Sequence, residues 1–339
     1  MPLSCAELDF PYTARDTPAL RARIDRDLEA AVRATATRDP SARALVLTGG
    51  FARGEGSARE ATPLNDYDFV LVRDRPGGGP VASSIAKALE RDLGIKVDLV
   101  PVFTGRLPWL APKLFWVETR AAGRVIAGQS RVIDLIPPFP PSTIPLSEAR
   151  RLLLNRAVGL LEGSAFGPEA ARWHAAKAVL ACVEARLIAR GLHDPSVATR
   201  LARFEALGMI DEIPLARWAT AFKLDPAAHD AVDADATWRA AKDALLATHA
   251  LLFPSAARAT FAEVAFHAAR SRRIALDPSG AVRRVALAAL ESCEGPEGPD
   301  RAKLARLNLS LAGLGATTAP TDWPGWVSAF LEVRAGTLQ

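Results

Sequence analysis

The sequence predicts an α+β fold, in which a small mixed sheet with helices is followed by an all-α C-terminal part. Short apolar runs typical of strands occur at residues 44–47 and 69–72, and residues 96–102 alternate in the manner of a strand. After residue 145, apolar residues recur at helical spacing, and many segments begin at proline. This change of pattern along the chain predicts a mixed sheet domain that precedes a helical domain.

A proline-rich stretch separates the two predicted domains. Five prolines lie between residues 136 and 145. Proline neither continues a helix nor donates a hydrogen bond to a sheet, so we expect an extended connector at 137–145. The predicted domains are therefore residues 1–136 and residues 146–339.

The elements of the first domain follow in order. Leu20, Ile24, Leu28 and Val32 recur at four-residue spacing and predict a helix over 17–38, with Thr17 before a proline at its start. A strand at 44–47 leads into the turn Gly49-Gly50. The remaining predicted elements are a short helix or loop to about 59, a strand at 67–73, a helix at 81–93, a strand around Asp98, a helix at 112–122 and a strand at 123–127.

The second domain is predicted to contain helices alone. Several of them end near a glycine. The sequence contains no repeat of fixed period, so a solenoid is not expected. The predicted helices are 146–161, 168–190, 196–207, 214–224, 226–252, 257–274, 281–291, 302–314 and 323–333.

Two carboxylates stand at the start of the strand at 67–73. Asp66 and Asp68 are two residues apart, and residues i and i+2 of a strand project to the same face. Carboxylates held that close repel each other and need positive charge nearby. A divalent ion supplies that charge, and hard oxygen ligands suit Mg²⁺ or Mn²⁺. The spacing therefore predicts a metal site at this strand.

A third carboxylate, Asp98, lies inside an otherwise apolar strand, where it is costly unless paired or bound to metal. If this strand lies beside the one that follows Asp66, three carboxylates converge, enough for a two-metal site. Glycines such as Gly49 and Gly50 let backbone N–H groups approach a phosphate closely. Carboxylates beside a phosphate cradle predict phosphoryl or nucleotidyl transfer.

The order Gly49-Gly50, Asp66-x-Asp68 and Asp98 resembles the DNA polymerase β-like nucleotidyltransferase superfamily. The run around Arg53 and residues 118–128 also resemble its small bacterial and archaeal members, so the resemblance covers roughly residues 40–128. One departure is the separation of Gly50 from Asp66, which is slightly longer than usual. An insertion at 57–63 would absorb the extra length.

The resemblance implies transfer of a nucleoside monophosphate, AMP from ATP, to a hydroxyl of a small molecule or protein. Asp66 and Asp68 would hold Mg²⁺ or Mn²⁺ with the nucleoside triphosphate, and Asp98 would bind a second ion or act as base. Gly49 and Gly50 would cradle phosphate oxygens. Arg53 would contact the triphosphate or form only an ion pair. Aminoglycoside nucleotidyltransferases likewise append a helical domain to this core.

Two other functional classes remain open. One is a non-catalytic nucleotide-binding or regulatory protein that keeps the fold, and the other is a polymerase or tRNA-end nucleotidyltransferase. The chain has a net charge of +4, but its basic residues form no long run, which argues against nucleic acid as a partner. In the helical part, Trp173 and Lys177 share one helix face. Lys177 could bind nucleotide phosphate, although core packing of Trp173 with a solvated lysine is the more ordinary interpretation.

The cysteines and the apolar segments predict a cytoplasmic protein. Cys5, Cys182 and Cys293 lie far apart, so neither a zinc site nor a disulfide framework is expected. We expect no signal peptide at the N-terminus. No apolar stretch reaches the roughly 20 residues that span a bilayer, so a membrane is not an expected partner.

Overall fold

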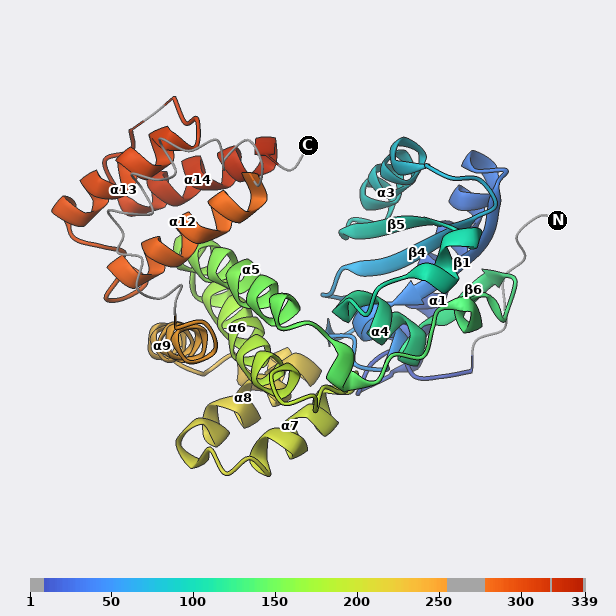
Figure 1. Ribbon diagram of the computed structural model, residues 1–339, viewed down its shortest axis with the longest axis horizontal. Coiled ribbons are helices and arrows are strands. Elements are labelled where there is room, and N and C mark those ends of the chain that lie inside the picture. Colours follow the sequence, from blue (N-terminus) through green and yellow to red (C-terminus); the bar gives the residue numbers. More distant parts are fainter. Residues whose placement is uncertain (1–8, 255–277, 318, 338–339) are drawn as a thin grey trace. The chain divides into compact units, whose positions relative to one another are not determined.

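The computed structural model describes residues 9–254, 278–317 and 319–337 of the chain (Figure 1). It shows a mixed α/β protein with a small four-stranded sheet and many helices. The chain forms two compact units. The first comprises Met1–Pro145, Gly191–Ala202 and Ala221–His229. The second comprises Leu146–Arg190, Arg203–Thr220 and Asp230–Gln339. The domain boundary placed at residues 137–145 stays a prediction.

The sheet has the strand order β5-β4-β1-β6. Its strands are β1 (Ala42–Thr48), β4 (Tyr67–Arg73), β5 (Val97–Phe103) and β6 (Arg124–Gly128). β1 runs antiparallel to β4 and β6, whereas β4 and β5 are parallel and are joined by helix α3 (Gly79–Leu93). A parallel pair requires such a crossover, so the helix predicted between the two acidic strands has a topological role.

Alternating side chains of β1 and β4 divide the core of the first unit into two clusters. Leu45, Leu47, Phe69 and Leu71 pack on one face against helix α1 (Pro18–Arg38) and α3. Val46 and Val70 face the other side, where Leu107 and Val132 cover them. Burial on both faces explains why these strands are continuous apolar runs. It also fixes their register, because a slip of one residue would exchange the two faces.

The first unit contains further short elements. They are α2 (Gly49–Ala52), β2 (Ala58–Arg59), β3 (Thr62–Pro63), α4 (Leu114–Ala122) and the 3₁₀ helices η1 (Thr104–Trp109), η2 (Val132–Leu135) and η3 (Pro141–Thr143). The expected insertion at 57–63 forms the hairpin of β2 and β3. Thr17 caps the start of α1, since its Oγ1 accepts a hydrogen bond from Leu20 N at 3.2 Å.

Every element after Pro145 in the described part of the chain is helical. These elements are α5 (Leu146–Ala165), α6 (Pro168–Ile188), α7 (Val197–Glu205), η4 (Ile210–Glu212), α8 (Ile213–Leu224), η5 (Pro226–His229), α9 (Ala234–Leu252), α12 (Pro278–Ser292), α13 (Arg301–Gly313) and α14 (Trp323–Thr337). None of the described helices is both long enough and apolar enough to cross a membrane. The helix predicted at 257–274 and Cys5 lie outside the described residues.

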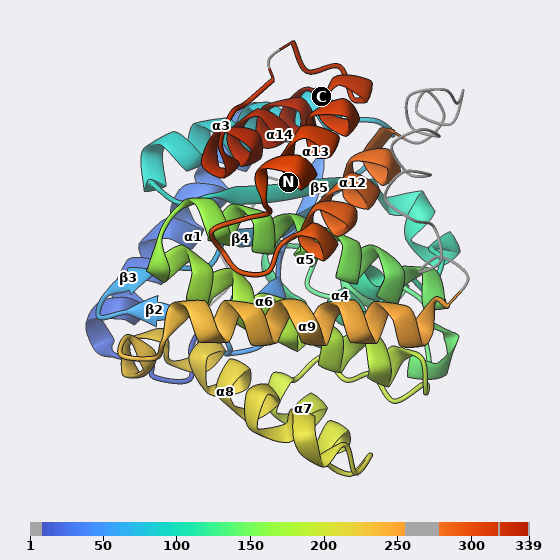
Figure 2. The same ribbon diagram turned by 90° about the vertical axis from the view of Figure 1, so that its left-hand side faces the viewer.

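The single helix predicted at 226–252 is wrong, because the chain forms η5 and then α9. Asp233 is the reason for the break. Its carboxylate accepts hydrogen bonds from the N–H groups of Asp235 and Ala236, which caps a new helix start. In Figure 2, α9 runs across the view in front of α6, against which it packs within the second unit. There the buried Trp238 indole donates to Leu160 O at 2.8 Å.

A buried ion pair joins two distant parts of the first unit. Arg73, at the end of β4, donates to both carboxylate oxygens of Asp39, and the two side chains are 9% and 2% exposed. Burial alone would raise the pKa of Asp39, but hydrogen bonds from Arg73 and Ser41 outweigh it and lower the pKa. The folded state therefore favours the ionised carboxylate.

We expect Arg73→Met to destabilise the protein by about 3–5 kcal/mol near neutral pH, because it leaves a buried carboxylate without its partner. A lowered pKa gives stability that is present above the unfolded pKa and is lost as pH falls through the folded pKa. The difference between variant and wild type should therefore shrink in acid. Urea unfolding across the acidic range measures it, and a difference that stays constant with pH would contradict this role.

Candidate active site

Three strand ends meet at one edge of the sheet and bring the predicted acids together. β1 ends at Thr48, which pairs with Asp68, the second residue of β4. Asp68 in turn pairs with Asp98, the second residue of β5. Because β1 is antiparallel to β4 while β5 is parallel to it, the end of β1 lies beside the starts of the other two strands. The neighbouring position of the two acidic strands, which the three-carboxylate hypothesis required, is therefore confirmed.

Asp68 is the innermost of the three carboxylates. Burial raises its pKa to about 6, and repulsion from Asp98 and Asp66 adds to that effect, whereas Lys96 opposes it. The proton is held more tightly because a second and a third negative charge stand beside a carboxylate with little access to water. The edge of the sheet thus carries an excess of negative charge.

Lys96 lies directly between the other two acids. Its Nζ donates to Asp98 Oδ2 at 2.8 Å and to Asp66 Oδ2 at 3.2 Å. Partial burial by itself would lower the pKa of Lys96, but the hydrogen bond to Asp98 and the charge of Asp66 outweigh it and raise the pKa. No sequence motif predicted a role for Lys96. The period of two was an available signal, since Lys96 and Asp98 stand two positions apart.

Gly49 follows β1 and sits against Asp68. Its φ of +68° lies in the left-handed region that side chains disfavour. A β-carbon at Gly49 would also overlap the Asp68 carboxylate. Both the backbone conformation and the nearby carboxylate therefore favour glycine at this position. The missing side chain is what lets the turn approach Asp68 so closely.

Lys223, at the end of α8, reaches the same turn within the first unit. Its Nζ donates to Asn65 Oδ1 at 2.6 Å and to Ser57 Oγ at 3.1 Å, and Ser57 Oγ donates back to Lys223 O at 2.6 Å. A β-carbon on Gly50 would lie 3.2 Å from this ammonium. Asn65 also accepts from Ser57 N, so it orders the chain ahead of Asp66. No motif in the sequence marked Lys223.

Arg53 belongs to a network of ion pairs. Its guanidinium contacts Glu55 at 3.0 Å and Glu118 at 3.3 Å, and its side chain is 13% exposed. Glu118 also contacts Arg200 at 3.2 Å. Burial opposes the charge on Glu118, but Arg53 and further hydrogen bonding and charge around it lower its pKa. The structure thus gives Arg53 two carboxylate partners, and its contact with a triphosphate stays a prediction.

The segment 191–202 is attached to this network. Glu55 Oε1 accepts a hydrogen bond from the backbone N–H of Val197 at 2.7 Å, and His193 Nε2 lies 3.5 Å from Glu118 Oε1. The residues directly after the Gly49-Gly50 turn are therefore held by a part of the chain that follows α6.

In the second unit, Lys177 Nζ lies 4.7 Å from the centre of the Trp173 ring, which is a cation–π contact.

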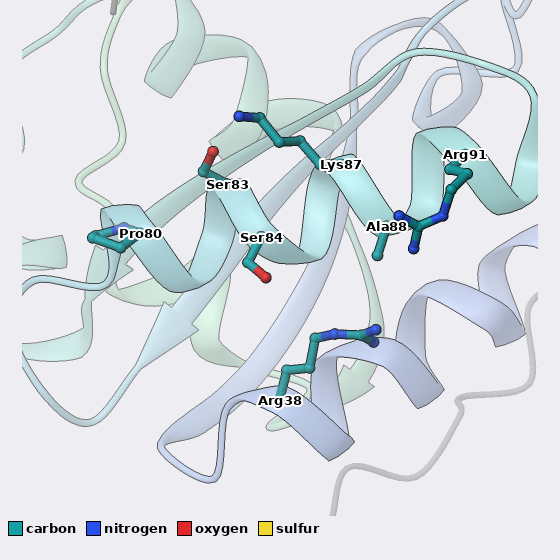
Figure 3. Close-up of a pocket in the computed structure, with 7 residues that line it drawn as sticks. All are labelled: Arg38, Pro80, Ser83, Ser84, Lys87, Ala88 and Arg91. Atoms are coloured by element: carbon teal, nitrogen blue, oxygen red, sulfur yellow. The ribbon is translucent and has the colours of Figure 1, made fainter.

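A separate hollow of about 540 Å³ lies between the end of α1 and α3 (Figure 3). Arg38, Lys87 and Arg91 line it. Arg38 and Arg91 approach each other across the hollow, whereas Lys87 points away from them (Figure 3). All three side chains are exposed, so they form no enclosed cationic pocket. The acids at the sheet edge are not among the residues that line it.

No protein-family model matches the chain, and comparison with curated proteins and with solved structures gives no significant match. The case for a function therefore depends on the chemistry of the residues at the sheet edge.

We expect Gly49→Ala to be more destabilising than Gly77→Ala. Both glycines have positive φ, +68° and +82°, but only Gly49 has a carboxylate where the new methyl group would lie, and Gly77 has open space. Backbone strain should cost each variant about 1–2 kcal/mol, and Gly49→Ala should pay a further steric cost. The urea midpoints of the two variants measure this.

A double variant isolates the contact with the carboxylate. Adding Asp68→Ala should recover more of the stability lost in Gly49→Ala than of that lost in Gly77→Ala, because relief of carboxylate repulsion acts in both backgrounds and relief of the steric contact only in the first. Equal destabilisation of the two single variants would show that Asp68 does not press on Gly49.

Proposed function

We propose that the chain is a metal-dependent nucleotidyltransferase that transfers a nucleoside monophosphate, AMP from ATP, to a hydroxyl acceptor. The observation that carries the proposal is the pairing of Asp68 with Asp98 on adjacent strands, with Asp66 beside them and the Gly49-Gly50 turn against Asp68. Carboxylates from two strands next to a glycine turn are what the resemblance to polymerase β-like nucleotidyltransferases implies.

The donor set fits a divalent ion. Asp66, Asp68 and Asp98 offer only carboxylate oxygens, which Mg²⁺ and Mn²⁺ prefer. The Lys96 ammonium, at 2.8 and 3.2 Å from two of these carboxylates, marks a position where positive charge is favourable. Burial raises the pKa of Asp68, and the negative charges of Asp98 and Asp66 add to that effect. A bound ion would neutralise charge on the triphosphate and polarise the phosphoryl group under attack.

Lys223 is suited to bind the phosphate chain of the nucleotide. Its ammonium stands beside Gly50, where glycine leaves room for the close approach of phosphate oxygens. The hydrogen bonds to Asn65 and Ser57 hold it there before a ligand arrives. A lysine acts as a point charge towards phosphate, so no planar fit is required.

Asp98 is suited to work on the acceptor. Its side chain is 52% exposed, whereas Asp68 lies deeper at the sheet edge. An accessible carboxylate can take the proton of an incoming hydroxyl, or bind a second ion that activates it. The acceptor class proposed is a hydroxyl of a small molecule or a protein, since no basic run in the sequence favours nucleic acid.

Release of pyrophosphate from ATP with Mg²⁺, in the presence of a metabolite mixture or protein acceptor, tests the reaction. Nucleotide binding without pyrophosphate release would favour the non-catalytic binding protein. Extension of a labelled RNA would favour the polymerase class instead.

We expect Asp98→Asn and Asp68→Asn to differ. Asp98→Asn should lower turnover by about 10²–10⁴-fold, as loss of a general base does, while keeping much of the triphosphate affinity. Asp68→Asn should abolish both turnover and Mg²⁺-dependent nucleotide binding. Steady-state kinetics and calorimetric ATP titration separate the two effects, and full activity in Asp98→Asn would refute the three-carboxylate mechanism.

We expect Lys223→Met to weaken ATP binding in the presence of Mg²⁺ by about tenfold or more, because it removes a charge-assisted contact with phosphate. Lys87→Met is the matched control, since Lys87 is an exposed lysine of α3 on the other side of the sheet from the acids. Unchanged ATP affinity in Lys223→Met would restrict this lysine to ordering Ser57 and Asn65.

A further inference from the structure

We propose that Lys96 is a built-in competitor of the divalent ion: its ammonium occupies the position between Asp66 and Asp98 and must leave when the ion binds. This inference rests on the proposed function, because it concerns the same carboxylates. It goes further by assigning to one residue the control of how readily the site takes up metal.

The backbone of Lys96 is held in place by the sheet. Its carbonyl oxygen accepts a hydrogen bond from Tyr67 N at 2.9 Å. The next residue, Val97, pairs with Tyr67 in the sheet. Tyr67 is fully buried, and its hydroxyl donates to Asp27 Oδ2 at 2.9 Å. The starting point of the lysine side chain is therefore rigid, and only the flexible stem can move.

The ammonium and a metal ion compete for the same oxygens. Lys96 Nζ lies 2.8 Å from Asp98 Oδ2 and 3.2 Å from Asp66 Oδ2. A Mg²⁺ ion binds carboxylate oxygen at about 2.0–2.1 Å. The carboxylates that would hold the ion are the ones that the ammonium already contacts, and two cations on the same carboxylates would repel each other. Both cations cannot occupy this position together.

Lys96 can leave without disturbing the fold. Its side chain is 57% exposed, so its stem can turn into water and expose little apolar surface. In the metal-free protein the ammonium offsets repulsion among the carboxylates. In the loaded protein the ion takes over that role. Removal of the lysine charge should therefore have opposite effects on the two states.

The test measures Mn²⁺ binding to the metal-free full-length chain by electron paramagnetic resonance, without nucleotide. We expect Lys96→Met to bind Mn²⁺ about three- to tenfold more tightly than wild type, the effect of removing ion pairs at an exposed position. Lys96→Arg, which keeps the charge, should remain near wild type, and Lys87→Met should not change the affinity. Equal or weaker Mn²⁺ binding in Lys96→Met would overturn the proposal.

A second readout excludes a purely structural role. In chelator, Lys96→Met should have a lower Tm than wild type, because the carboxylates lose their counter-charge, and saturating Mn²⁺ should remove the difference. A deficit that persists in Mn²⁺ would contradict competition.

Asp68→Asn distinguishes failure of this inference from failure of the proposed function. If wild type binds Mn²⁺ and Asp68→Asn does not, the metal site stands whatever Lys96→Met shows. If Asp68→Asn binds Mn²⁺ as wild type does, the metal site itself is refuted, and the role of Lys96 with it.

Discussion

The burial of β1 and β4 on both faces is the interaction on which the rest of the first unit depends, because it holds Asp66, Asp68 and Asp98 together against their mutual repulsion. Three carboxylates gather at one sheet edge only if stronger interactions hold the strands there. The apolar residues of β1 and β4, buried on both faces, supply them. Because the register decides which face each residue occupies, the same packing that stabilises the core aims the acids. Hydrophobic burial elsewhere in the sheet thus offsets the repulsion among the carboxylates at its edge.

The cations around the acids differ in their exposure and in the groups that they contact. Lys96 is exposed and bridges the two outer carboxylates. Lys223 stands by the glycine turn and is held by neutral hydrogen-bond acceptors. Arg53 is partly buried and contacts the carboxylates of Glu55 and Glu118. Of these, Arg53 is the least suited to rearrange around a ligand, since moving it would deprive the buried Glu55 and the partly buried Glu118 of a positive charge.

Much of the sheet could be predicted from the sequence because its signals are local. The apolar runs of β1 and β4, the glycine after α3 and the crossover to β5 each depend on neighbouring residues. The signals of the acids are local too: Asp66 and Asp68 stand two residues apart at a strand start, and Asp98 is an acid within an otherwise apolar strand. The roles of Asp66, Asp68, Asp98, Gly49, Gly50 and Arg53 towards metal and nucleotide stay predictions.

Long-range placement could not be predicted. Lys223 is 158 residues from Asn65, and nothing around it distinguishes it from other helical lysines. Trp173 precedes Lys177 by one helical turn, which made this lysine a candidate phosphate ligand, and the observed contact of Lys177 is with that ring. The break before α9 was not predicted, because the helical spacing of apolar residues continues across it. The cap at Asp233 starts a new helix there.

The first unit is discontinuous in sequence, and this has a consequence for how the protein is made. Its segments 191–202 and 221–229 carry Arg200 and Lys223, and they leave the ribosome only after α5 and α6 have been synthesised. Domains that fold as units during synthesis need their whole sequence to be available. The sheet can form early, but the lysine beside the glycine turn arrives late. A nascent chain that stops before residue 223 therefore exposes its acids without that cation.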